Sequence, residues 1–571
     1  MMSIGELLFE GPRDLFLSIA LQFLTLDELA RLDSAVCSSQ RPSYLNALSS
    51  REAVVENIRI GGRIVQPGAA VLEWLRRRQL GVRQLGVKAD RASGCFRYLS
   101  HSLSRPLEGL SIERASTTQL AKLLPHCPAL LQLTIKGCGE GGNKHIQPLS
   151  ACPKLHFLTL SHLDVVRSAH LKGLVQAYAC LRVESCSNFS KRAVLDLHLP
   201  HLRDLSLHSV CAMKDSRLTR LLLGCPRLEV LSIRGCGGVS QKGLCGVGVV
   251  GSLLTLHLWG VTDAVVDSIV GGCRRLQHID LHHSPLTDQS MRRILSSCRH
   301  LQTLSFTACG IVGEGEVRVG YTGDRPLTSL TFNSCLALQG VMNVCEQFPR
   351  LAHLALDDCI AARHTACTEA FRHGKSLKYF CLTGSPHIYG YDLEAITEPL
   401  PLMQRVVVDN CSHFSDEGAI SLALLCPHLT HLSMQHCDVR LQAFAPYLAR
   451  MEDLDITGAH VCSPAGLAAL LQCLGLHSLG VSIEGEGGEG GADLLEQIAL
   501  SSPQHLRLLR LDFLDFVHVQ ALVRMLDALG NLVTIQVGQS SINFAQYGVF
   551  LLKRLYPGVE INVCSVAALE V

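Results

Sequence analysis

Residues 225–258 read CPRLEVLSIRGCGGVSQKGLCGVGVVGSLLTLHL, and this stretch decides the fold because it contains one pattern twice. An apolar residue, two variable residues, an apolar residue, one variable residue and another apolar residue begin at Leu228 and again at Leu253. A pattern that returns after this interval predicts a unit made of a short strand, a turn and a returning helix. Such a unit buries its apolar face only by stacking on copies of itself.

The same spacing recurs along most of the chain. We count 19 copies, the first beginning at Val82 and the last at Leu532, with a mean spacing of 25 residues. Residues 81–571 are therefore predicted to form an α/β leucine-rich-repeat solenoid, with a curved parallel sheet inside and helices outside.

Cysteine is placed in register with these repeats. Counted from the first apolar residue, one set of cysteines lies eight places on: Cys138, Cys186, Cys236, Cys309, Cys335, Cys359, Cys411 and Cys437. A second set lies three places before it: Cys127, Cys152, Cys225, Cys273, Cys298, Cys426 and Cys473. Free cysteine packs as a small apolar residue, so we expect these to be buried thiols in a reducing compartment. Ten cysteines fall outside this register: Cys37, Cys95, Cys180, Cys211, Cys245, Cys345, Cys367, Cys381, Cys462 and Cys564.

The composition excludes several classes of protein. Of the 571 residues 47% are hydrophobic, which excludes a disordered chain, and the formal charge of +1 favours neither nucleic acid nor a membrane surface as partner. The charge is unevenly distributed, because residues 51–105 hold 11 basic and 4 acidic residues and residues 451–571 hold 5 and 13. The apolar stretch 243–261 contains five glycines and three polar residues, so we do not interpret it as a membrane span.

The complete unit resembles the cysteine-containing repeats of F-box/leucine-rich-repeat proteins over about residues 80–560. It reads roughly Cys-x-x-Leu-x-x-Leu-x-Leu-x-x-Cys and is followed by a Thr-Asp turn, as at residues 261–263 and 286–288. We expect the Thr, Ser or Asp side chain of this turn to cap the helix that follows.

In that family an F-box precedes the repeats and binds a Skp-type adaptor of a cullin ubiquitin ligase. Residues 11–37 resemble one, although the tryptophan that usually follows the Val-Cys pair is absent. The resemblance implies an F-box-like helical module at 1–50, and we interpret 51–80 as a basic helical transition or cap. It also implies these adaptor-binding residues: Pro12, Leu15, Phe16, Ile19, Leu24, Leu29 and Val36. The alternative is that these helices only cap the solenoid.

The variable strand positions are expected to line the concave face and to bind a protein partner. Trp259 is one of two tryptophans, and a large aromatic residue in a groove is a typical interface anchor. The candidate partner-binding residues are His208, Arg234, His257, Trp259, His278, His282, His283, Asp357, Tyr379 and Arg405. The plainer interpretation is that they are ordinary solvated strand residues.

No catalytic motif stands out. The glycine pattern at residues 485–490 fits a dinucleotide fingerprint formally, but three glutamates in and beside it would repel a pyrophosphate. The clustered histidines lack zinc-type spacing, so we expect no metal and no cofactor. The sequence thus predicts a non-catalytic substrate-recognition subunit of a cullin-type ligase, a monomer within a complex, in cytoplasm or nucleus, without nucleic acid or membrane contacts. The alternative is a scaffold subunit of a larger assembly, for instance a cytoskeletal one.

Overall fold

A computed structural model describes the chain in two compact units. The first comprises Met1–Trp259 and Asp267–Arg275, and the second comprises Gly260–Val266 and Leu276–Val571. The residues that the structure describes are 54–57, 59–60, 63–64, 73, 75, 77, 81–88, 106–115, 120, 122–138, 152–163, 165–166, 179–186, 188–189, 199–211, 213–310, 325–335, 344–359, 365–385, 388–389, 393, 396, 398–439, 450–458, 475–482, 490–501, 503, 505–512, 518–538 and 544–563.

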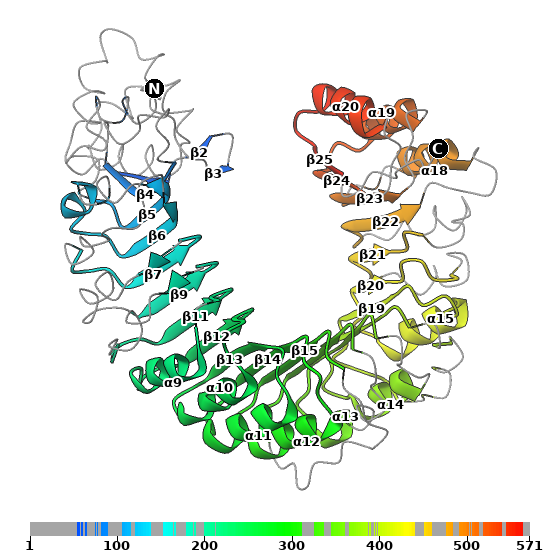
Figure 1. Cartoon of the computed structure of the whole chain (residues 1–571). Coiled ribbons are helices and arrows are strands. Elements are labelled where there is room, and N and C mark those ends of the chain that lie inside the picture. The colour runs from blue at the N-terminus through cyan, green and yellow to red at the C-terminus, as the bar shows by residue number, and fades with distance from the viewer. Residues whose placement is uncertain are drawn as a thin grey trace, which may run out of the picture. The chain divides into compact units, whose positions relative to one another are not determined.

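The first unit contains a parallel sheet whose strands follow one another in chain order (Figure 1). Its strands are β1 (Val54–Asn57), β4 (Gly81–Lys88), β5 (Gly109–Ala115), β6 (Gln132–Cys138), β7 (Phe157–Ser161), β9 (Cys180–Glu184), β11 (Asp204–His208), β12 (Val230–Arg234) and β13 (Thr255–Trp259). Two small pairs lie apart from it: antiparallel β2 (Arg59–Ile60) with β3 (Arg63–Ile64), and parallel β8 (Val165–Val166) with β10 (Asn188–Phe189). Its helical segments are η2 (Leu124–His126), α9 (Asp215–Leu223), α10 (Gln241–Cys245) and η4 (Gly246–Val249).

The second unit repeats this arrangement. Its parallel strands are β14 (His278–His282), β15 (Thr303–Thr307), β16 (Ser329–Asn333), β17 (His353–Asp357), β18 (Tyr379–Thr383), β19 (Arg405–Asp409), β20 (His431–Ser433), β21 (Asp453–Asp455), β22 (Ser478–Ser482), β23 (Leu508–Asp512), β24 (Thr534–Val537) and β25 (Glu560–Val563). Its helices are α12 (Asp288–Ser297), α13 (Val344–Gln347), α14 (Thr365–His373), α15 (Asp416–Leu425), α18 (Gly490–Ser501), α19 (Val519–Ala528), the π-helical η9 (Phe544–Gly548) and α20 (Val549–Leu555). Residues of α11 (Asp263–Gly272) belong to both units. Within each unit the helices lie on one face of the sheet (Figure 1).

The predicted leucine-rich-repeat fold is confirmed. Each of the 19 repeats expected between Val82 and Leu532 contains one of the strands β4–β7, β9 and β11–β24. The described part of the chain adds β1 before the first repeat and β25 after the last. Within the predicted helical transition at 51–80, the structure shows strands β1 to β3 and a helical stretch around Leu75. The F-box-like residues 1–50 lie outside the described residues.

The core lies between sheet and helices because strand residues alternate between two faces. In β15 the second and fourth residues are buried and the other three are half-buried. Large aromatic side chains fill the core of the second unit. Phe306 stacks on Phe332 with ring centroids 5.3 Å apart, and Phe371 meets Phe380 edge-on at 4.6 Å.

A left-handed backbone conformation recurs at the seventh place after the repeat start. Fifteen repeats have a positive φ there, and five of these positions are glycine, as at Gly235 and Gly260. The next residue is often one of the in-register cysteines. Seven of these cysteines, from Cys186 to Cys437, are buried. Each of the seven thiols donates to a backbone carbonyl in the strand of the preceding repeat, at 2.8–3.8 Å. The eighteen cysteines whose side chains are described are free thiols.

The predicted side-chain capping is wrong for α10, α12 and α15, where no side chain caps the helix, and α9 also begins without a side-chain cap. The acidic residue of the turn instead accepts hydrogen bonds from the next repeat. Asp263 accepts from the backbone N–H and the hydroxyl of Thr287, both at 2.9 Å, and also from Ser290. Asp215 accepts from the N–H and hydroxyl of Ser240 in the same way. Asp215 and Asp263 therefore join their repeats to the next ones, whereas Asp288 of the later turn pairs with Arg292 in its own helix.

Candidate interaction surface

The face of each sheet opposite the helices, here called the open face, carries three rows of side chains. They come from the positions two, four and six places after each repeat start. The candidate residues lie at these positions except His283, which occupies the left-handed turn one residue beyond β14. Because parallel strands in register place equivalent residues side by side, each row crosses the sheet from strand to strand.

Trp259 lies in one such row of the first unit, with His208 and Arg234. The guanidinium of Arg234 lies over the indole of Trp259 at 5.4 Å from the ring centroid, and the ring of His208 meets the indole edge-on at 6.3 Å. His208 also contacts the hydroxyl of Ser232 through Nε2 at 3.0 Å, and burial lowers its pKa. The structure thus brings three predicted residues together, with Trp259 half-buried.

The remaining histidines make contacts of their own on the open face. His257 lies in the middle row of β13 and is half-buried. In the second unit, His278 Nδ1 lies 2.7 Å from the hydroxyl of Thr303, and His282 Nε2 lies 2.8 Å from a carboxylate oxygen of Asp280. Within the described residues, no group of three or more His, Cys, Asp or Glu side chains is placed to hold a metal ion.

A groove of about 370 Å³ crosses the open face of the second unit between β17 and β23. We call it the unit 2 groove. Its floor contains the buried residues Cys381 and Val407, which form one buried cluster with Ala355 of β17. The row on one side contains aromatic and basic residues, and the row on the other is acidic. These lining residues are Asp357, Tyr379, Cys381, Thr383, Arg405, Val406, Val407, Asp409, His431, Leu432, Ser433, Gln435, Asp453, Asp455 and Arg510.

Tyr379 is held between two neighbours in the aromatic and basic row. The ring of His353 stacks on it with centroids 4.2 Å apart and planes 7° apart, and the guanidinium of Arg405 lies 5.8 Å from its centroid. The three residues come from adjacent strands in register, which explains the contact. Two of the predicted site residues, Tyr379 and Arg405, therefore lie together in the groove, and Asp357 lines its opposite side.

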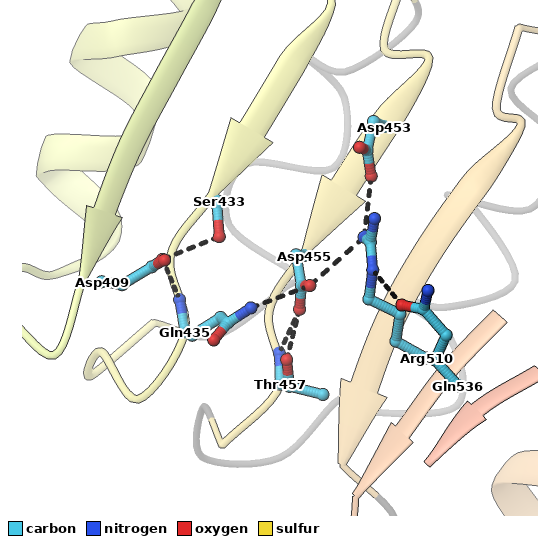
Figure 2. A network of polar contacts seen from close by, with 8 residues as sticks. All are labelled: Asp409, Ser433, Gln435, Asp453, Asp455, Thr457, Arg510 and Gln536. Atoms are coloured by element: carbon cyan, nitrogen blue, oxygen red, sulfur yellow. Dashed lines mark hydrogen bonds and ion pairs between the residues drawn. The ribbon is translucent and has the colours of Figure 1, made fainter. Parts of the chain in front are cut away.

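Arg510 links the carboxylates at one end of the groove (Figure 2). Its Nη1 lies 3.0 Å from Asp453 Oδ1 and 3.2 Å from Asp455 Oδ2, and its Nε donates to Gln536 Oε1 at 3.2 Å. Burial acts to raise the pKa of Asp453, but its contact with Arg510 outweighs this and the pKa is lowered. Gln435 donates to Asp455 at 2.9 Å, so the network continues onto the preceding repeat, which contains β20.

The reach of Arg510 depends on a glycine. Asp455, Gly480 and Arg510 occupy equivalent positions of β21, β22 and β23, so Gly480 lies between the other two. A Cβ on Gly480 would lie 2.2 Å from Asp455 Oδ1. The absence of a side chain is what lets the arginine cross one strand to the carboxylate. Sequence reasoning did not select Arg510, although a glycine in a lining position is a detectable signal for such a bridge.

Asp357 and Asp409 differ from Asp455 because only neutral groups bind them among the described residues. Asp357 accepts hydrogen bonds from Asn333 and Thr383. Asp409 accepts from the hydroxyl of Ser433 at 2.7 Å and from the backbone N–H of Gln435 at 2.8 Å, both on Oδ1. Burial raises the pKa of Asp409 despite these bonds. Among the described residues, the groove thus holds two carboxylates that form no ion pair with a lysine or arginine, although His436 lies near enough to Asp409 to interact with its charge.

The thiol on the groove floor is not an activated nucleophile. Cys381 is 6% exposed, and burial raises its pKa to about 11, so it is protonated at neutral pH.

No helix among the described residues is long and apolar enough to cross a membrane.

Comparison with known proteins points to one repeat family. The family model "FBD-associated F-box protein At5g56370, LRR repeats" matches residues 172–270. The DNA repair protein rhp7 of Schizosaccharomyces pombe is 27% identical over 281 residues, which are 43% of this chain and 47% of that protein. The chain therefore spans about half the length of this curated relative.

One solved structure shares the architecture. The TLR13–ssRNA13 complex aligns over 90% of this chain and 74% of that chain, with 14% identity and a TM-score of 0.50. The yeast Rad7 and Elc1 complex aligns over 79% of this chain and 90% of that chain, with 13% identity and a TM-score of 0.34, too low to bear on the assignment. The chain is therefore a leucine-rich-repeat protein, and its repeats resemble those of F-box-associated proteins.

Proposed function

We propose that this protein is the target-binding subunit of a cullin-type ubiquitin ligase and is itself not a catalyst. Residues 11–37 would bind a Skp-type adaptor, and the open face would bind a protein target. The observation that carries the proposal is the combination of an F-box-like segment with repeats that match an F-box-associated family model. The open face supports the second half, because it presents the half-buried Trp259 and a polar groove rather than a uniform surface.

Affinity purification tests the adaptor contact. The intact chain is compared with a chain lacking residues 1–50 and with a full-length variant carrying Leu15→Ala and Ile19→Ala. We expect the intact chain to recover a Skp-type adaptor and a cullin and both altered chains to lose them. Circular dichroism must show that the altered chains keep the repeat fold. Equal recovery by all three chains, or recovery by none, would reject the ligase role.

A second candidate is a scaffold subunit of a larger assembly, with the N-terminal segment acting only as a cap. The likeness to a DNA repair protein favours this version in one respect, since it would make the chain part of a DNA-repair assembly. The ligase role is compatible with the nucleus or the cytoplasm. The same purification separates the two candidates, because a scaffold would recover its assembly with or without residues 1–50.

A further inference from the structure

We propose that the unit 2 groove binds an extended segment of a protein partner that presents Lys or Arg side chains to Asp357 and Asp409. The inference rests on the proposed target-binding role and names the chemistry of the target at this site. It follows from the charge of the groove, its floor and the position of its only ion-paired arginine among the described residues.

The charge of the groove is not balanced within the described residues. Four aspartates line it, against two arginines, Arg405 and Arg510, and one histidine, His431. Arg510 pairs with Asp453 and Asp455 at the end of the groove, and Arg405 lies over Tyr379. Carboxylates held by neutral donors in a partly buried site gain from a cation that arrives with a ligand, because the partner charge offsets their desolvation.

The two unpaired carboxylates lie in one row. Asp357, Thr383 and Asp409 occupy equivalent positions of three adjacent strands, and Thr383 donates to Asp357. Strands in a sheet are about 4.8 Å apart, so the two aspartates are spaced by about 10 Å. The long, flexible side chains of lysine and arginine span this interval from neighbouring positions of an extended backbone.

The floor fits the backbone of such a segment. Cys381 and Val407 on the floor have short side chains, so a polypeptide approaches the sheet closely between the two rows. His353 and Tyr379 close one side with stacked rings. A nucleic acid does not suit this groove, because its phosphates would face the four aspartates.

Fluorescence anisotropy with the purified full chain tests the proposal. The probe is the labelled peptide acetyl-Gly-Ala-Arg-Ala-Arg-Ala-Gly, with the Gln-substituted and Glu-substituted peptides as matched probes. We expect the Arg peptide to bind at least about tenfold more tightly than either of them, with affinity falling as salt rises. Equal binding of the three peptides would overturn the proposal without any variant being made.

Variants then assign the binding to the groove. The double variant Asp357→Asn with Asp409→Asn keeps the shape of both side chains and should weaken binding of the Arg peptide by about tenfold. Arg405→Gln removes a positive charge that repels the Arg peptide and should tighten binding of the peptide by about twofold. Asp438→Asn, an exposed acid outside the groove lining, is the control and should leave affinity unchanged. An unchanged affinity in the double variant, or the same loss in the control, would reject the site. Because no adaptor is present, failure of the ligase role leaves this result intact, and the reverse also holds.

Discussion

Gly480→Ala should break the ion pair between Arg510 and Asp455. The new Cβ would lie 2.2 Å from Asp455 Oδ1 and 2.5 Å from its Cγ, whereas non-bonded carbon contacts lie at roughly 3.5 Å. The carboxylate, which is 6% exposed, must therefore move by about 1 Å, and its 3.2 Å contact with Arg510 is lost. A hydrogen bond to a charged group contributes about 1.5–3 kcal/mol, and alanine regains about 0.5–1 kcal/mol over glycine within a strand. The net expected loss is about 1–2 kcal/mol.

Hydrogen-exchange mass spectrometry measures this loss locally, which suits a repeat protein because its repeats need not unfold together. A loss of about 1.4 kcal/mol corresponds to about tenfold faster exchange of the amides of residues 475–512. Gly530→Ala is the matched control, since nothing lies within 4 Å of a Cβ there, and it should leave exchange unchanged or slower. In an Arg510→Gln background, Gly480→Ala should cost less because the pair is already absent. Unchanged exchange in Gly480→Ala alone would refute the bridging role of the glycine.

Three further perturbations follow from the contacts. Asp263→Ala removes three hydrogen bonds to the next repeat and should destabilise the second unit by about 2–3 kcal/mol, measured by urea unfolding followed by circular dichroism. Hydrogen bonding lowers the pKa of Asp263 despite its burial. The stability lost in the variant should therefore shrink as pH falls through the acidic range. Asp409→Asn should stabilise the folded chain at pH 7 and lose that effect in acid. Burial, with a contribution from neighbouring Asp455, raises the pKa of the Asp409 carboxyl above its unfolded value, so this group is unfavourable in the folded state only once it is ionised. An Asn variant that is less stable than the native chain at pH 7 would contradict this. Trp259→Ala should abolish capture of the main protein target while adaptor recovery persists, and unaltered capture would remove the surface around Trp259 from the binding site.

The repeat fold was predictable because its signal is local and multiplied. An apolar spacing that returns 19 times leaves little freedom for strand position or register, and the cysteine register agrees with it. The role of Asp263 was not predictable from spacing, because an acidic residue at the start of a helix can cap that helix or bond the next repeat. Only the stacking of the two turns decides between these uses.

The groove shows where sequence reasoning reached its limit. Position within the repeat places Tyr379 and Arg405 on adjacent strands in one row of the open face, because register follows from the repeat. The same rule could not reveal that Arg510 crosses a strand to reach Asp455. That contact depends on what an intervening position lacks, and the strands involved are separated by the longest repeat in the chain.

One of the two carboxylates proposed to bind a basic segment is unfavourable in its own site. Asp455 pairs with Arg510, whereas Asp409 is partly buried, accepts hydrogen bonds from neutral donors and has a pKa that burial raises. If Asp409→Asn stabilises the free chain and weakens the Arg peptide, then the native residue is unfavourable for folding and favourable for binding. Such a residue is explained by a ligand that supplies the missing charge, since folding alone gives no reason for it. The stability and affinity measurements on this one variant therefore test the groove from two independent sides.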